Sequence, residues 1–394
     1  MLLIKNGKIL TMAGKILDQG DILIIDGKIA AVENAIDISF NKNDLLIDAK
    51  GLWVMPGIID AHCHVGISEE KKGNEGEDCN ELTSAITPYL RSLDAINTMD
   101  PAFHNAIQAG ITSVMVGPGS TNVVGGQFTF MKTHGRVIEK MIVLAPAAIK
   151  VSFGENPKTS HQDMNQPPTS RMTIAAMLRE ELYKALYYKK KKELAKEMGE
   201  DFEEDFRLEP WIPVLEKRIP LKAHVHRTDD ILTAIRIAKE FDLNMTLDHC
   251  TEGHIIAEEI KDSGYCAILG PDLACRNKLE VQNADFKTAG VLNSKGVKVA
   301  IMTDHPVTLI QYLPLYAGLA AKKGLGIEEG LKAITINPAI ICGVGDRVGS
   351  IEVGKDADIA IFTGNPMEVF THTVYTIING EIVYKYTDDE KTEE

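Results

Sequence analysis

The sequence predicts an α/β protein in which a (β/α)₈ TIM barrel is combined with a small β-sandwich built from both chain termini. Its length of 394 residues suits a barrel of about 250 residues plus a smaller module. The middle of the chain alternates apolar, strand-like runs with amphipathic stretches. Both ends instead show short alternating strands broken at Asp26-Gly27 and Asn379-Gly380, dipeptides that are typical of hairpin turns.

The barrel is expected over residues 57–346, and amphipathic stretches such as 229–241 and 253–264 are its expected helices. The connection at 134–149, between the third and fourth strands, is the weakest β/α unit, and a doubly wound sheet is the alternative fold. The eight predicted strands are GIIDAH (57–62), ITSVMVG (111–117), QFTFMKT (127–133), AAIKVSF (147–153), PLKAHVH (220–226), NMTLDHC (244–250), CAILGP (266–271) and VKVAIMTD (297–304).

The β-sandwich is expected to comprise residues 1–56 and 347–386. A mostly helical insertion is expected at about 158–218, because this stretch is too long for an ordinary loop. It is either a packed or interface subdomain or a lid over the barrel mouth. The charged segment 387–394 is expected to be disordered.

Composition excludes several classes of protein. The formal net charge of -14 disfavours nucleic acid and anionic membranes as partners, because phosphates would meet no overall positive field. No apolar run approaches the ~20 residues that span a bilayer, and Asn6-Gly7 and Gly14 interrupt any signal-peptide core. Six cysteines without paired spacing indicate reduced thiols and a cytoplasmic protein. A small-molecule substrate is the expected partner, and a homo-oligomer is left open.

Polar residues stand at the ends of several predicted strands. His62 and His64 end the first strand, and side chains two residues apart in a strand point to the same face. The ends of barrel strands meet at one mouth, so packing explains one such residue but not the whole set. The set predicts a metal site. The other members, from the fourth, fifth, sixth and eighth strands, are Lys150, His224, His226, His249 and Asp304.

The motif DAHCH, which follows MPGIID, resembles the first-strand HxH motif of the amidohydrolase superfamily. The stretch AITINPAIICGVGDRVGSIEVGKDADIAIFTGNP is similar to the usual exit of that superfamily from its barrel. Within the superfamily the chain resembles imidazolonepropionase-like and prolidase-like members. The resemblance implies a metal-dependent hydrolase that cleaves a C–N bond in a small cyclic amide, lactam or dipeptide. A deaminase of aromatic bases and a scaffold without metal are the alternatives.

Two features weigh against these alternatives. Related deaminases usually place an acid two residues after the strand-five histidine, whereas this chain has His226 there. Scaffolds of this fold tend to lose their ligands, whereas this chain keeps His62, His64 and Asp304. Hydrolysis is therefore the favoured reading.

The resemblance also implies roles for single residues. His62 and His64 would bind the first metal, and Asp304 would move a proton from the attacking water to the leaving nitrogen. His226 would polarise the substrate carbonyl or bind a substrate carboxylate. Mixed imidazole and carboxylate ligation favours Zn²⁺, one or two ions per chain, with Fe, Mn and Ni as alternatives. The implied metal ligands are His62, His64, Lys150, His224, His249 and Asp304.

The fourth strand offers two candidate ligands. In related enzymes with two metals, a lysine carboxylated by CO₂ bridges the ions, whereas others use a glutamate. Lys150 is favoured over Glu155, because an unpaired cation in an apolar strand is costly unless it is paired or neutralised. After the seventh strand, Arg276 and Lys278 could meet an anionic substrate, but isolated surface cations are commoner, so neither is included in the predicted site.

Overall fold

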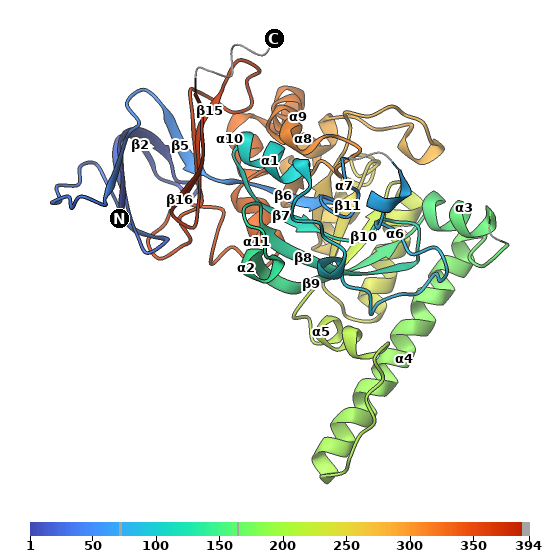
Figure 1. Cartoon of the computed structure of the whole chain (residues 1–394). Helices are drawn as coiled ribbons and strands as arrows, with labels where there is room; N and C mark the ends of the chain where they lie inside the picture. The colour runs from blue at the N-terminus through green and yellow to red at the C-terminus, as the bar shows by residue number, and fades with distance from the viewer. Residues whose placement is uncertain (71–72, 164, 388–394) are drawn as a thin grey trace.

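The computed structural model describes residues 1–70, 73–163 and 165–387. Figure 1 shows a strand-rich part that holds the N-terminus, beside a larger part in which helices surround a second set of strands. The segment expected to be disordered, 387–394, lies outside the described residues apart from Thr387. Within the described ranges, none of the helices is long and apolar enough to cross a membrane.

The larger part is the predicted barrel. Eight strands form one sheet in the order β13-β12-β11-β10-β9-β8-β7-β6. The sheet closes where the backbone N–H of Asp304 donates to the carbonyl of His62 at 3.2 Å, and that of His64 to the carbonyl of His305 at 3.0 Å. The strands are β6 (Ile58–Cys63), β7 (Ile111–Val116), β8 (Val124–Lys132), β9 (Ile142–Ser152), β10 (Leu221–Val225), β11 (Met245–His249), β12 (Cys266–Leu269) and β13 (Val299–Ile301).

Strand β8 departs from the regular β/α alternation, because it runs antiparallel to both β7 and β9. The links on its two sides, 117–123 and 133–141, contain no long helix. A parallel neighbour needs a crossover of about a dozen residues or more, and these links are too short for one. The weak β/α unit at 134–149 is therefore an antiparallel connection with one short helical turn.

The second sheet is built from both ends of the chain. Its order is β16-β15-β14-β5-β1-β2-β3, and β4 pairs with the first half of β1. The second half of β1 pairs with β5 instead, and a Cβ atom at Gly7, between the two halves, would lie only 2.5 Å from Val54. The strands are β1 (Leu2–Leu10), β2 (Ile16–Ile25), β3 (Lys28–Glu33), β4 (Leu45–Asp48), β5 (Trp53–Pro56), β14 (Ile359–Phe362), β15 (Thr373–Ile378) and β16 (Glu381–Lys385).

This terminal sheet has an apolar core of its own, which includes Ile4, Ile22, Val54 and Ile359. Only Gly57 separates β5 from the first barrel strand. A Cβ atom at Gly57 would lie 2.1 Å from Thr112 Oγ1, so glycine is required for this close passage. Strand β6 is thereby fixed at the point where the chain leaves the terminal sheet.

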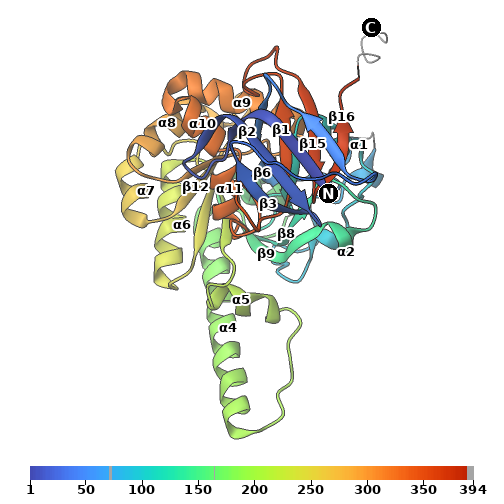
Figure 2. The ribbon, with the colours of Figure 1, turned by 90° about the vertical axis from the view of Figure 1, so that its left-hand side faces the viewer.

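The helices cover the barrel, except for the insertion. The 28-residue helix α4 starts at its N-cap Ser170, whose side chain accepts from the Thr173 N–H, and ends at Gly199 in the left-handed conformation. Its second half runs away from the barrel in Figures 1 and 2. The helices are α1 (Pro101–Gln108), α2 (Ile138–Met141), α3 (Glu155–Asp163), α4 (Arg171–Met198), α5 (Ile212–Leu215), α6 (Thr228–Glu240), α7 (Ala257–Ser263), α8 (Lys287–Ser294), α9 (Leu313–Ala320), α10 (Ile327–Lys332) and α11 (Ile336–Ile341).

Candidate metal centre

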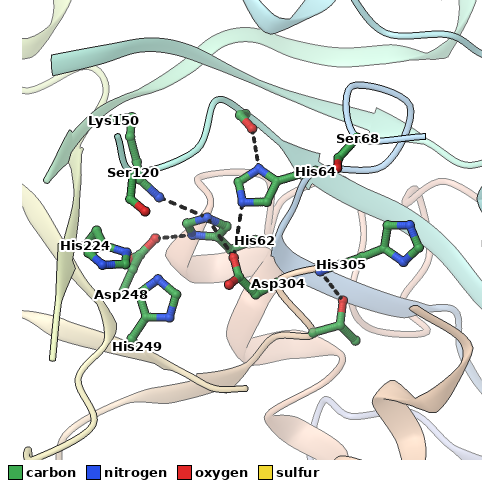
Figure 3. A network of polar contacts seen from close by, with 12 residues as sticks. His62, His64, Ser68, Ser120, Lys150, His224, Asp248, His249, Asp304 and His305 are labelled. Atoms are coloured by element: carbon green, nitrogen blue, oxygen red, sulfur yellow. Dashed lines mark hydrogen bonds and ion pairs between the residues drawn. The ribbon is translucent and has the colours of Figure 1, made fainter. Parts of the chain in front are cut away.

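Two groups of three ligand-type side chains lie beside each other at the end of the barrel. Within each group, the ligand atoms are all within 4.8 Å of one another. The groups adjoin, because the ring centroids of His62 and His249 are 5.7 Å apart. Figure 3 shows His62, His64, His224, His249 and Asp304 converging from different strands. The groups are His62, His64 and Asp304, and His224, His226 and His249.

His62 is fully buried and held by a chain of polar contacts. Its Nδ1 lies 2.6 Å from Asp248 Oδ2, and Asp248 in turn pairs with Lys222 Nζ at 2.9 Å. A carboxylate on Nδ1 fixes the imidazole tautomer and leaves Nε2 as the free donor atom. Thr246 donates to the other oxygen of Asp248 at 2.6 Å. His62 is therefore oriented before any metal binds.

His64 and Asp304 complete the first group. The Nδ1–H of His64 donates to the carbonyl of Gly117 at 2.7 Å, and its Nε2 lies 3.2 Å from Asp304 Oδ1. Burial alone would lower the pKa of His64, but Cys79 and Asp304 raise it to about 10. Burial would raise the pKa of Asp304, but His249 and His64 hold it well below its usual value. Asp304 is thus a carboxylate surrounded by imidazoles.

The second group consists of imidazoles alone. His249 donates from Nδ1 to the carbonyl of Gly270 at 2.8 Å, and its ring centroid is 4.3 Å from that of His224 and 4.5 Å from that of His226. Burial lowers the pKa of His249 to about 4. Burial and the neighbouring His249 also lower the pKa values of His224 and His226. Neutral imidazoles are the form that binds a metal. Nδ1 of His224 is buried without a hydrogen-bond partner, so the set fits a metal ion.

The backbone changes conformation where the ligands stand. His249, Cys250 and Asp304 have left-handed φ angles of 67°, 47° and 53°. Such angles are uncommon for residues other than glycine and cluster at functional sites. The change at His249 ends the strand alternation, so that Asp248 and His249, although adjacent in sequence, both reach the site.

The structure separates the two candidates of the fourth strand. Lys150 is 1% exposed, and its Nζ lies 3.1 Å from His62 Nε2. Burial lowers the pKa of Lys150 to about 8. Glu155 begins α3, lines a different cavity, and donates its backbone N–H to Glu280. Only Lys150 therefore lies among the donor groups.

A cavity of about 280 Å³ opens onto both groups. Besides the ligand-type residues, Cys79, Ser120 and Asn156 line it, as does the loop that follows β12. No pattern in the sequence singles out Cys79, although its thiol interacts with His64. Among the described residues, α4 contributes nothing to the lining.

Two further histidines, His305 and His254, have hydrogen-bond partners of their own. His305 is buried outside both groups, and its Nδ1 accepts from the Ile310 N–H at 3.2 Å. His254 is half-buried and bonds Thr288 at 3.0 Å. The supporting residues Asp248 and Lys222 were missed, although each stands one or two positions before a ligand-type histidine in LDHC and KAHVH. That spacing was the signal that could have identified them.

Comparisons with known proteins point to one family. The family model described as "Amidohydrolase family" matches residues 53–383. The solved structure of an amidohydrolase from Thermotoga maritima MSB8 is 38% identical in sequence, with a TM-score of 0.94. The match covers 98% of this chain and 100% of that one.

Curated relatives match across most of this chain. Amidohydrolase tasK of Hapsidospora irregularis is 27% identical over 388 residues, which are 92% of this chain but 39% of the relative. The chain thus spans well under half the length of tasK. Imidazolonepropionase of Picrophilus torridus is 25% identical over 388 residues, covering 91% of each protein.

Proposed function

Because the chain belongs to the amidohydrolase family, we propose that it is a metal-dependent hydrolase cleaving a C–N bond in a small cyclic amide, lactam or dipeptide. The observation that carries this proposal is the pair of donor groups that share one cavity. A cavity of about 280 Å³ suits a small substrate rather than a folded polypeptide.

We assign the metal ligands to His62, His64, His224, His249 and Asp304, with Lys150 between the two groups. A divalent metal held there would polarise the substrate carbonyl and lower the pKa of a water molecule. Mixed nitrogen and oxygen donors favour Zn²⁺, and two donor groups allow one or two ions per chain.

Asp304 is the proposed proton carrier. Its carboxylate lies at the boundary between the groups, 3.2 Å from His64 Nε2 and 3.7 Å from His62 Nε2. As an anion it can accept a proton from the attacking water and return it to the departing nitrogen, which would otherwise leave as an unstable amide anion. Its side chain is only 14% exposed, which limits the access of bulk water to that proton.

His226 is proposed to contact the substrate. Its Nδ1 lies 2.7 Å from Thr251 Oγ1, which leaves Nε2 to act toward the cavity. Its proximity to His224 and His249 supports a second reading, in which it also binds metal. Under either reading it holds the carbonyl side of the substrate near the ligand groups.

The proposal also covers the cell compartment and the binding partner. All six cysteines are free thiols, which supports a cytoplasmic protein. The partner is a small-molecule substrate, and a homo-oligomer remains part of the proposal.

The test is hydrolysis by the full chain loaded with Zn²⁺. A panel of dipeptides, lactams and cyclic ureides is incubated with wild type, chelator-treated protein and the His62→Asn/His64→Asn double variant. We expect turnover of at least one class by wild type only, with zinc content reduced in the double variant. Full metal occupancy in a folded double variant would contradict the ligand assignment.

A further inference from the structure

Cationic side chains line the cavity in a chain whose net charge is -14. The loop after β12 supplies two cationic side chains to its lining, Arg276 and Lys278, and Asp304 is the carboxylate among the described lining residues. Bound divalent metal would add to the positive charge. A cleft with charge of one sign concentrates ligands of the opposite sign. The electrostatics of the site therefore favour an anionic substrate.

Lys278 lies close to the donor groups, although it belongs to the loop between β12 and the 3₁₀ turn Leu279–Val281. Its Nζ donates to Asn156 Oδ1. Nδ2 of the same asparagine lies 3.5 Å from His224 Nε2 and donates to Ser120 Oγ at 2.6 Å. The ammonium group is thus one side chain away from a proposed metal ligand.

Glu280 forms an ion pair with Lys278 but lies too far away to accept a hydrogen bond from it. The carboxylate is 1% exposed, and its Oε2 accepts the Glu155 N–H at 2.8 Å. Its Oε1 is 3.7 Å from Lys278 Nζ and 3.8 Å from His226 Nε2, and has no hydrogen-bond partner. An ammonium carries three N–H donors. Asn156 takes one, so Lys278 keeps donors for a ligand in the cavity.

We propose that Lys278, oriented by Asn156 and Glu280, binds a carboxylate that the substrate carries close to its scissile C–N bond. This inference rests on the proposed function and narrows its substrate class to small amides bearing a free carboxylate. Arg276 lines the same cavity from the exposed side of the loop and donates to the backbone carbonyl of Ala284 at 2.6 Å, so it adds positive charge at the entrance.

Carboxylate binding by Lys278 would position the substrate for cleavage. A charge-assisted hydrogen bond to a substrate group fixes one end of the molecule, and the donor groups then meet its other end. A lysine that only paired with Glu280 would not need to line the cavity. The short path through Asn156 to His224 limits the separation between the carboxylate and the bond to be cleaved.

The test compares ligands that differ only in the carboxylate. Zinc-loaded full chain is titrated by calorimetry with N-acetylglycine, N-acetylproline and glycylproline, and with the corresponding carboxamides. The same pairs are offered as substrates. We expect wild type to favour at least one free acid over its amide by about 10- to 100-fold, in line with one charge-assisted hydrogen bond.

The variants are Lys278→Met, Lys278→Arg and the control Lys295→Met. Lys295 is a half-exposed lysine that pairs with Glu258 away from the cavity, so its substitution should leave the preference intact. Lys278→Met should reduce the preference for the acid to near unity, mainly through KM, and Lys278→Arg should retain part of it. The arginine variant keeps the test valid if the methionine variant folds poorly.

The outcomes separate the two proposals. Carboxylate binding that depends on Lys278, without hydrolysis of any compound, would contradict the proposed function but support this subsite. Hydrolysis with equal preference for acids and amides would contradict the subsite alone. Absence of carboxylate binding by wild type, or equal binding by wild type and Lys278→Met, would also overturn it.

Discussion

Lys150 lies near the C-terminal end of β9, and we expect its protonation or carboxylation to determine how the two donor groups are joined. Its Nζ is 3.1 Å from His62 Nε2, and burial lowers its pKa to about 8. About a tenth of the amine would then be neutral at pH 7, far more than for an unperturbed lysine, and this is the form that reacts with CO₂. The resulting carbamate is an anion whose two oxygens would suit the space between the groups.

Lys150→Ala should reduce the zinc content from two ions to one per chain and lower turnover, with partial rescue by added short-chain carboxylate. Glu155→Ala is the matched control, since Glu155 lines a separate cavity. Metal analysis by mass spectrometry and steady-state assays provide the readouts. Unchanged zinc content in Lys150→Ala, with zinc lost from Glu155→Ala, would reverse the assignment.

The proposed proton transfer by Asp304 can be tested by substitution. Asp304→Asn keeps the size and an oxygen donor but removes the proton acceptor, so turnover should fall by about 10²- to 10⁴-fold with a smaller change in KM. Zinc content is measured alongside, because the residue is also a proposed ligand. A variant that retains zinc and near wild-type turnover would refute the proton-transfer role.

Sequence reasoning identified the donor residues because strand alternation places His62 and His64 on one face and strand ends meet at one mouth. It did not reveal Asp248 or Lys222, because their partners lie on other strands and only the closed barrel brings them together. Lys278 was noticed but dismissed as a surface cation. Its contact with Asn156 spans 122 positions and depends on a loop path that no local pattern specifies.

At the level of elements, the barrel and terminal sheet are joined by buried charges. Lys132 ends β8, and its Nζ pairs with Asp356 at 3.0 Å and with Asp358, both in the segment before β14. Lys28 and Arg347 also contact Asp356, at 2.5 and 2.9 Å. The antiparallel direction of β8, which short connections impose, brings its C-terminal end to this junction.

Lys132→Met should destabilise the protein by about 3–5 kcal/mol, because it removes the buried cation that pairs with Asp358, whereas Asp356 keeps Lys28 and Arg347. Lys140→Met, on the exposed side of α2, is the same substitution without a buried partner and should change stability by about 0.5 kcal/mol or less. Urea unfolding followed by circular dichroism measures both. Equal midpoints for the two variants would show that the cluster contributes little.

The charged cluster around Asp356 should make the stability of the protein depend on pH in the acid range. Burial alone would raise the pKa of Asp356, but Lys132, Lys28 and Arg347 outweigh it and lower the pKa. A lowered native pKa stabilises the fold above the unfolded value of about 4, and this contribution is lost as pH falls through the lower native value. Stability of wild type should therefore drop more steeply below about pH 4 than that of Asp356→Asn. Parallel acid profiles would contradict this.

For the whole molecule, metal binding and folding should be coupled. The donor groups come from strands that are far apart in sequence, and only the closed barrel brings them together, so Zn²⁺ should bind the native state in preference to the unfolded chain. Free zinc at 100 times its dissociation constant would then stabilise the protein by about 2.7 kcal/mol. This stabilisation should raise the melting temperature by several degrees, and a chelator should reverse it.

Proton release provides an independent check on that coupling. Without metal, Cys79 and Asp304 outweigh burial and raise the pKa of His64 to about 10, so its ring carries a proton at neutral pH. The ion pair of protonated His64 with Asp304 stabilises the folded protein fully at pH values below about 6.5, the pKa of histidine in the unfolded chain. This stabilisation is lost as pH rises toward 10. Zinc must displace the proton, so its apparent affinity should increase as pH rises over this interval. Calorimetry in buffers of different ionisation enthalpy should detect the proton released by wild type, and His64→Asn should release less. Equal release from both proteins would mean that His64 does not donate to the metal through Nε2.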